Sequence, residues 1–144
     1  METGGFKGKM KEVSKSELYA ACRERLGIKK NFCFGEYGMT ELSSQCYDAV
    51  LPGSSESLKF QRYFKSPPWL KTLVIDPLTE KEAKRGKIGL LRHFDLANRG
   101  SVLAVQTQDR GRLVGDGFEL LGRAKKSGLR GCSLDYERLL AGNK

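Results

Sequence analysis

The sequence lacks any apolar run of about 18 residues, the length that a membrane-spanning helix needs. Its first residues, METGGFKGKMKEVSK, contain no apolar core of a secretory signal peptide, so the sequence favours a cytoplasmic protein. Histidine is nearly absent, since His93 is the single one, and the four cysteines form no CxxC pair. A zinc site is therefore not expected, and we expect the cysteines to be reduced thiols.

Acidic residues are few relative to basic ones. The chain has 26 Lys and Arg against 17 Asp and Glu, a net charge of +9, which attracts polyanions and makes nucleic acid one candidate partner. The basic residues are scattered, and an aromatic content of 9% provides no stacking surface beside a basic groove. We therefore expect most of this charge to be solvated, with a nucleotide or an acidic protein as the anions that it could meet.

The chain is long enough for one domain. Its 144 residues, 39% of them hydrophobic, can bury a core, and no internal repeat is present. Residues 14–27 are typical of a helix that Ser14 or Ser16 caps and Gly27 ends. The apolar face of this helix is expected to comprise Leu18, Ala21, Cys22 and Leu26.

Strands are expected after this helix. The apolar and aromatic character of residues 30–34, followed by Gly35 and Gly38, predicts a buried strand that ends in a sharp turn. Later strands are expected at 72–77, 88–96 and 101–108, then a hairpin within 109–123 turning at 115–117, and a final helix within 133–142. The fold class is therefore α/β, with one βα segment (1–51) followed by a mostly antiparallel β element and a short C-terminal helix (69–144).

The stretch FGEYGMTELSSQ has the residue types of an ATP site. Such a site needs an aromatic face for adenine, close backbone approach, a hydroxyl near phosphate and a carboxylate for Mg²⁺, and Tyr37, Gly38, Thr40 and Glu41 supply these in order. The alternative is that Tyr37 is a core aromatic residue, the glycines form an ordinary turn, and Thr40 and Glu41 cap a helix. Spacing alone leaves both interpretations open.

The segment Tyr37-Gly38-Met39-Thr40-Glu41 resembles the Y-G-x-T-E motif of the adenylate-forming enzymes, which include acyl-CoA ligases and firefly luciferase. The resemblance implies that the aromatic ring stacks on adenine, the threonine lies against phosphate and the glutamate helps to hold Mg²⁺. Thr107-Gln108-Asp109 resembles the T-G-D motif, with Gln108 in place of glycine, and implies that Asp109 binds both ribose hydroxyls. Residues 115–123 resemble the following D-G-x-x-x-x-x-G-R stretch, with four residues in place of five between Gly117 and Gly122. The resemblance implies that its arginine, here Arg123, contacts ribose or the α-phosphate.

Three longer segments narrow the resemblance to the acyl-protein synthetases, also called long-chain-fatty-acid luciferin-component ligases. They are ETGGFKG at the start of the chain, EYGMTELSSQCYD and LGRAKKSGLRGCSLDYE. The resemblance implies ATP-dependent activation of a fatty acid as acyl-AMP, transfer of the acyl group to an enzyme cysteine and delivery to a partner reductase. It also places Gly4 and Gly5 against the adenine edge.

Cys132 is the candidate acyl acceptor. It lies two positions from Arg130 at the expected start of the last helix, and both features favour the reactive thiolate. The position also resembles that of the acylated cysteine of the acyl-protein synthetases. The alternative is a small buried apolar residue, which is the role expected of Cys22. Lys125 lies near the hinge position implied by the resemblance to the adenylate-forming enzymes, and the alternative is a surface charge in a basic loop. His93 is assigned no role.

The adenylate-forming enzymes carry a phosphate loop upstream of Y-G-x-T-E, and few residues precede Tyr37 here. We therefore expect the carboxyl-terminal part of a longer enzyme, or a truncated gene product, that adenylates very little alone. Within it, Tyr37 and Asp109 are expected at opposite ends of one nucleoside-sized cavity. The competing hypothesis is a small basic binding module for nucleic acid or an acidic protein, without catalysis.

Overall fold

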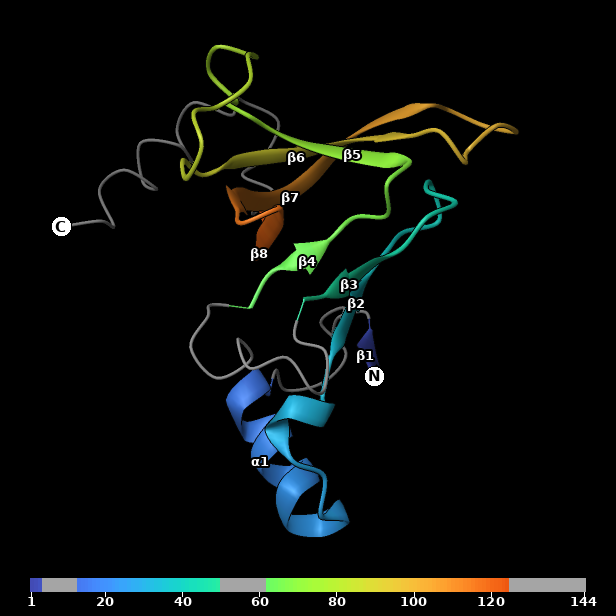
Figure 1. The fold of residues 1–144 in the computed structure, drawn as a ribbon. Coiled ribbons are helices and arrows are strands. Elements are labelled where there is room, and N and C mark those ends of the chain that lie inside the picture. Colours follow the sequence, from blue (N-terminus) through green and yellow to red (C-terminus); the bar gives the residue numbers. More distant parts are fainter. Residues whose placement is uncertain (4–12, 50–61, 125–144) are drawn as a thin grey trace, which may run out of the picture.

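The computed structural model describes residues 1–3, 13–49 and 62–124 (Figure 1). These residues form one helix, a short 3₁₀ turn (Lys30–Phe32) and strands that all belong to one sheet. The helix is α1 (Lys15–Leu26), and the strands are β1 (Glu2–Thr3), β2 (Gly35–Tyr37), β3 (Cys46–Asp48), β4 (Phe64–Lys65), β5 (Leu70–Ile75), β6 (Gly89–Asp95), β7 (Ala104–Val114) and β8 (Gly117–Arg123).

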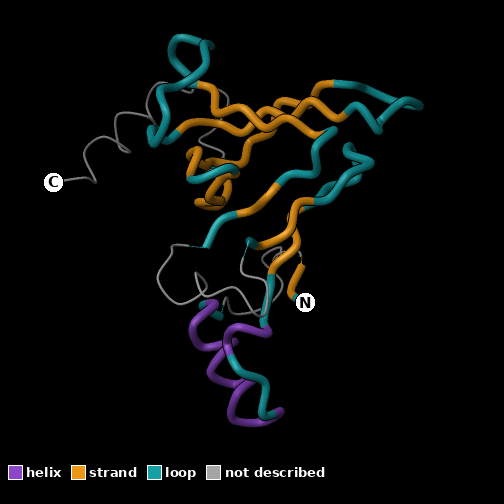
Figure 2. The backbone as a smooth tube through the Cα atoms, viewed as in Figure 1, coloured by secondary structure: helices purple, strands orange, loops and turns teal. Residues whose placement is uncertain are grey.

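The sheet has the order β1-β2-β3-β4-β8-β7-β6-β5. The β1–β2 pair is parallel and every other pair is antiparallel, which agrees with the expected mostly antiparallel β element. Figure 2 shows the short strands β1 to β4 leading from the helical end toward the longer strands β5 to β7. Pairing of Phe64 with Phe118 joins these two halves.

The expected helix is confirmed at both ends. The Ser14 hydroxyl accepts a hydrogen bond from the Glu17 backbone, the Glu17 carboxylate accepts one from the Ser14 backbone, and Gly27 ends the helix with a left-handed φ of 67°. The expected apolar face is wrong at Leu18 and Leu26, which are 38% and 68% exposed, whereas Ala21 and Cys22 are half-buried. Tyr19 is the buried residue of the helix. The Tyr19 ring lies 4.7 Å from the Arg62 guanidinium, so a cation–π contact holds the helix where aliphatic packing was expected.

Ser14→Ala is expected to lower the free energy of unfolding by about 1 kcal/mol, because the substitution removes one half of the capping box. Urea denaturation followed by circular dichroism measures this change. Ser101→Ala provides an exposed serine control outside the helix and is expected to change stability by less than about 0.5 kcal/mol. Equal midpoints for the two variants would contradict the role of the cap.

The strand expected at 30–34 is wrong in position. Residues 30–32 form the 3₁₀ turn, and the strand covers Gly35–Tyr37. The reason is non-local, because Glu36 pairs with Tyr47 of β3 and Thr3 of β1, and composition near residue 30 carries no information about those partners. The strands expected at 72–77 and 88–96 and the hairpin at 109–123 are confirmed as β5, β6 and β7–β8, while the expected final helix lies outside the described residues.

The core is formed by side chains of β2, β3, β4, β5, β6 and β8. Phe118 and Leu91 are fully buried and are joined there by Tyr37, Phe64 and Cys46. The backbones of β4 and β8 also pack closely, since a Cβ at Gly117 would collide with the carbonyl oxygen of Phe64. The sheet therefore brings the end of β2 directly against β6 and β8.

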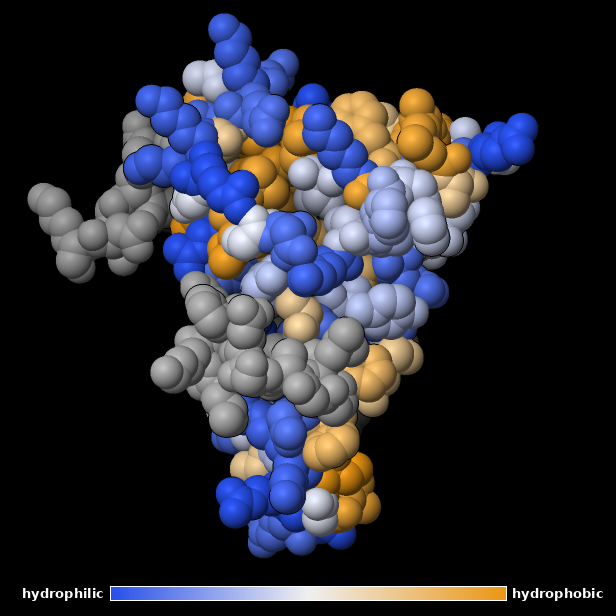
Figure 3. Space-filling model, in the orientation of Figure 1, coloured by the Kyte–Doolittle hydropathy of each residue, from blue (hydrophilic) through white to orange (hydrophobic). Residues whose placement is uncertain are grey.

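Among the described residues, apolar side chains are exposed at several places. Figure 3 shows two of these places, near the connection of β6 to β7 and beside α1, and the exposed apolar residues there are Leu96, Val102, Leu103, Leu26, Ile28 and Phe32. Among the helical residues that the structure describes, no segment has the length and apolar character to cross a membrane.

Candidate nucleotide site

The Y-G-x-T-E segment runs from the end of β2 into the loop before β3. Tyr37 is the last residue of β2 and its side chain is buried, whereas Gly38, Thr40 and Glu41 are exposed. A hydrogen bond of 3.1 Å from the Leu42 amide to the Met39 carbonyl closes the turn that contains Thr40 and Glu41. The segment therefore buries its aromatic residue and presents its hydroxyl and carboxylate to solvent.

Asp95, at the end of β6, holds this loop in place. Its carboxylate accepts hydrogen bonds from the backbone amides of Ser43 (3.0 Å) and Ser44 (2.9 Å) and from the Ser44 hydroxyl (2.8 Å). The nearby Asn98 amide donates to the Glu41 carbonyl oxygen over 2.8 Å. The backbone around Glu41 is thus fixed by side chains more than fifty residues away in sequence.

Asp109 and Arg123 face one another across the β7–β8 pair. The Arg123 Nε atom donates to the Asp109 Oδ1 atom over 3.1 Å, and the two side chains are 77% and 12% exposed. The Asp109 amide donates to the Thr107 hydroxyl, which itself donates to the Leu91 carbonyl oxygen. The T-Q-D segment therefore fixes its carboxylate at the edge of the core, with a solvent-exposed guanidinium beside it.

Tyr37 and Asp109 meet directly. The Tyr37 hydroxyl donates to the Asp109 Oδ2 atom over 2.9 Å, so residues from both sequence motifs form one cluster with Arg123. The expectation of a nucleoside-sized cavity between the Tyr37 and Asp109 side chains is wrong, because the two side chains are in direct contact. The Tyr37 ring is only 6% exposed and lies 5.3 Å from the Phe118 ring and 5.4 Å from the His93 ring, because β2 places it on the same side as the aromatic core.

His93 continues the cluster into the core. Its Nε2 atom lies 3.1 Å from the Tyr37 hydroxyl, and its Nδ1 atom lies 3.0 Å from the Thr72 hydroxyl. The Thr72 hydroxyl lies 3.1 Å from that of Ser66, which lies 3.5 Å from the Cys46 sulfur. A continuous polar chain therefore runs from Asp109 through the centre of the sheet to Cys46.

Burial sets the protonation states along this chain. It lowers the pKa of His93 to about 4, although the Asp109 and Asp95 carboxylates oppose the change. It raises the pKa of Tyr37 far above the ordinary value, with the Asp109 charge adding to the rise, and raises the pKa of Cys46 to about 11. At neutral pH the histidine, the phenol and the thiol are therefore all uncharged.

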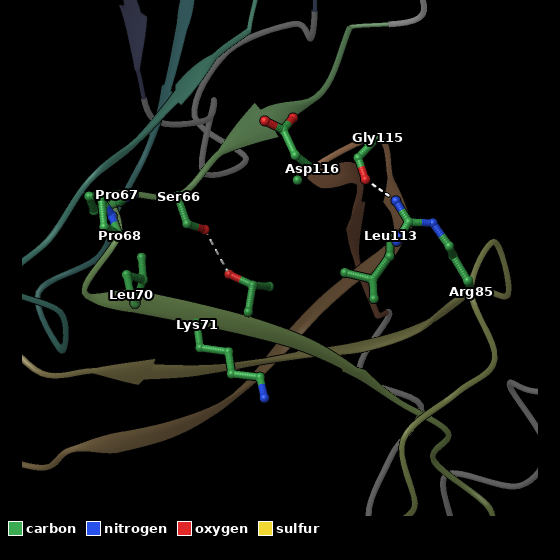
Figure 4. A pocket seen from close by; sticks show the side chains of 11 residues that line it. Ser66, Pro67, Pro68, Leu70, Lys71, Arg85, Leu113, Gly115 and Asp116 are labelled. Carbon is green, nitrogen blue, oxygen red and sulfur yellow. Dashed lines mark hydrogen bonds between the residues drawn. The ribbon is translucent and has the colours of Figure 1, made fainter.

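A surface hollow lies at the end of the polar chain opposite Asp109, beside Ser66 and Thr72. Figure 4 looks into this hollow of about 470 Å³, whose wall includes Ser66, Leu70, Lys71, Leu113 and Asp116, and shows the Ser66–Thr72 hydrogen bond in it. A second hollow, of about 560 Å³, lies beside the loop after β2 and is lined in part by Ser44, Tyr47 and Trp69. Neither hollow is lined by Tyr37 or Asp109.

His93 and Asp95 were missed by sequence reasoning. The signal that could have found them is the period-two pattern of β6, in which Gly89, Leu91, His93 and Asp95 are buried and the residues between them are less so. Buried polar residues in a strand require partners, and here His93 contacts Tyr37 of the first motif while Asp95 holds Ser43 and Ser44 shortly after it. Gly4, Gly5, Lys125 and Cys132 lie outside the described residues.

Neither a protein-family model nor a curated protein matches the chain. Solved structures do match its fold. MatB from Rhodopseudomonas palustris is 19% identical with a TM-score of 0.56, over 85% of this chain and 25% of MatB. The McyG A-PCP structure complexed with phenylalanyl-adenylate is 19% identical with a TM-score of 0.57, over 79% of this chain and 21% of that one.

A third match is the luciferase-like enzyme from the nonluminescent mealworm Zophobas morio, 19% identical with a TM-score of 0.54, over 81% of this chain and 30% of that enzyme. The chain has the fold of part of the adenylate-forming enzymes. This confirms the expected partial adenylate-forming fold. The chain spans less than a third of the length of these relatives, and the narrower resemblance to acyl-protein synthetases stays a prediction.

Proposed function

We propose that this chain supplies part of an ATP site for the activation of a carboxylic acid as its adenylate. One observation carries the proposal: Tyr37 of the first motif and Asp109 and Arg123 of the second form one hydrogen-bonded cluster. Residues of two chance turns would have no reason to meet across 72 positions, so the contact supports a shared site. The likeness in fold to adenylate-forming enzymes supports the same conclusion.

Asp109 and Arg123 are the proposed nucleotide ligands at the strand edge. A carboxylate can accept two hydrogen bonds from a ribose diol, and both are strengthened by its charge. Arg123 is mostly exposed, so its guanidinium can turn toward an α-phosphate while remaining near Asp109. Tyr37 would take part through its hydroxyl on the Asp109 carboxylate, because stacking on adenine would require its ring to leave the core.

Thr40 and Glu41 are the proposed phosphate and Mg²⁺ ligands. Mg²⁺ is commonly held by one or two carboxylates, with substrate phosphates and water completing its shell. Glu41 suits this role because it is an exposed carboxylate on a loop fixed by Asp95 and Asn98. Within residues 1–3, 13–49 and 62–124 no cluster of three metal-binding side chains occurs, so the triphosphate would supply most of the remaining ligands. The bound ion would neutralise phosphate charge.

The proposed reaction has two steps. The substrate carboxylate attacks the α-phosphorus of ATP, forming acyl-AMP and releasing pyrophosphate, and Arg123 offsets charge on the α-phosphate. The Cys132 thiolate then attacks the acyl carbon, forming a thioester and releasing AMP. A long-chain fatty acid as substrate, Gly4 and Gly5 at adenine, and an acyl-accepting reductase as partner belong to this proposal through the resemblance to acyl-protein synthetases.

ATP binding is the appropriate test, because the chain spans only 21–30% of its structural relatives. Calorimetry with ATP and Mg²⁺ is expected to show binding that Asp109→Ala weakens by about tenfold to a hundredfold, since two charge-assisted hydrogen bonds are lost. Glu41→Ala is expected to lower affinity only when Mg²⁺ is present. Glu82→Ala removes an exposed carboxylate outside both motifs and serves as the control.

The net charge of +9 favours a second candidate, a binding module for nucleic acid or an acidic protein. Such a module would bind polyanions with an affinity that falls steeply with salt and would not distinguish Asp109→Ala from Glu82→Ala. No ATP binding together with a steep salt slope for DNA or RNA would contradict the nucleotide proposal.

A further inference from the structure

The polar chain through the core has a single consistent hydrogen-bond direction. The Tyr37 hydroxyl has one proton, and it donates that proton to the Asp109 Oδ2 atom. The Tyr37 oxygen must then accept the hydrogen bond from His93, which places the imidazole proton on Nε2. The neutral ring leaves Nδ1 as an acceptor, and Thr72 donates to it.

The hydrogen bonds keep the same donor-to-acceptor direction between Thr72 and Cys46, at the other end of the polar chain. Thr72 donates its single hydroxyl proton to His93, so the Thr72 oxygen accepts the hydrogen bond from the Ser66 hydroxyl. The Ser66 oxygen in turn accepts from the Cys46 thiol. Each bond polarises the next toward Asp109, and no donor in the chain lacks an acceptor.

We propose that His93 is a positioning residue: as the Nε2–H tautomer it holds the Tyr37 hydroxyl on Asp109 and thereby orients the carboxylate that receives the ribose hydroxyls. This inference rests on the proposed function. His93 is fully buried and touches no exposed surface, so it acts through Tyr37 and not on the nucleotide. The Phe118 ring, 5.8 Å away, fixes the imidazole from the side.

The geometry explains why the tyrosine ring is buried. The phenol bonds the Asp109 Oδ2 atom from inside the core, so Oδ1, which Arg123 contacts, is the oxygen nearer to solvent that a ligand would share. Asp109 then has one oxygen fixed from within by Tyr37 and the other flanked by the exposed Arg123 guanidinium. A carboxylate without the inner contact could rotate, and its two hydrogen bonds to a diol would lose their alignment.

The first test compares ATP with 2′,3′-dideoxy-ATP, which lacks the ribose hydroxyls, in two His93 variants. His93→Gln retains an N–H near the Nε2 position, whereas His93→Asn reaches only the Nδ1 position. The wild type and His93→Gln are expected to prefer ATP by about tenfold or more, and His93→Asn is expected to lose most of that preference. Circular dichroism confirms that each variant is folded before binding is measured.

Equal preference for ATP in folded His93→Asn and wild-type protein would overturn the positioning role while leaving the proposed function standing. Equal binding of both nucleotides by the wild type would overturn the proposed function and this inference with it. Tyr37→Phe keeps the ring and removes the hydroxyl, so it is expected to lose the preference to the same degree as His93→Asn. A Tyr37→Phe variant that still prefers ATP over 2′,3′-dideoxy-ATP would also overturn the positioning role of the hydrogen bonds from His93 through Tyr37 to Asp109.

A second test needs no variant, because His93 is the single histidine of the sequence. Long-range ¹H–¹⁵N NMR of the imidazole distinguishes its two neutral tautomers. The expected result is a protonated Nε2 with Nδ1 as the acceptor at pH 7. A proton on Nδ1 would make His93 a donor to Thr72 and an acceptor from Tyr37, and would overturn the inference.

Discussion

Phe118→Ala is expected to lower the free energy of unfolding by about 3–5 kcal/mol, because it empties the centre of the aromatic core. Phe118 has no exposed surface, and its ring lies 5.3 Å from the Tyr37 ring and 5.7 Å from the Phe64 ring. Removal of the ring loses buried apolar contact on both halves of the sheet at once. Urea denaturation followed by tryptophan fluorescence measures the change.

Phe32→Ala is the matched control for this prediction. Phe32 is 54% exposed in the 3₁₀ turn, so its loss is expected to cost less than about 1 kcal/mol. A similar cost for the two variants would contradict the position of Phe118 at the centre of the core.

Acidification from pH 7 to pH 5 is expected to lower the stability of the fold by about 2 kcal/mol through His93 alone. Burial holds the pKa of His93 at about 4 in the folded chain, below the ordinary value of 6.5. Between these values the unfolded chain binds a proton that the folded chain does not bind, so stability is complete above pH 6.5 and falls as pH decreases toward 4. The total loss through this group is about 3 kcal/mol.

Denaturation midpoints of the wild type and His93→Gln at pH 7 and pH 5 isolate this contribution. The Asp109 and Asp95 carboxylates that face the imidazole remain in the variant, so the difference between the two slopes reports the histidine. The variant is expected to lose about 2 kcal/mol less than the wild type over this interval. Parallel slopes would contradict a neutral, buried His93.

Local signals in the sequence were sufficient for the helix and the hairpin. Ser14 and Gly27 mark both ends of α1, because capping depends on residues within one turn. Gly115 and Asp116 lie between β7 and β8 as expected, with Gly115 at a positive φ of 56°. The position of β2 and the buried face of α1 were not predictable in this way, since β3 and Arg62 determine them from a distance.

The candidate site also has features that local sequence signals predict and features that distant residues determine. The motifs identify Tyr37, Asp109 and Arg123 from neighbouring residues, and the structure brings these three together. Burial of the Tyr37 ring depends on Phe64, Phe118 and His93, which belong to three other strands. The sequence therefore indicated the composition of the cluster but not that its tyrosine holds the carboxylate from inside the core.

The most direct measurement of the central claim is the affinity of the wild type and of Asp109→Ala for ATP and for 2′,3′-dideoxy-ATP. Binding of the ribose diol by Asp109 predicts that the wild type prefers ATP by about tenfold or more and that Asp109→Ala binds both nucleotides equally. A wild-type chain that binds both nucleotides with the same affinity, or an Asp109→Ala variant that keeps the full preference for ATP, would contradict the account.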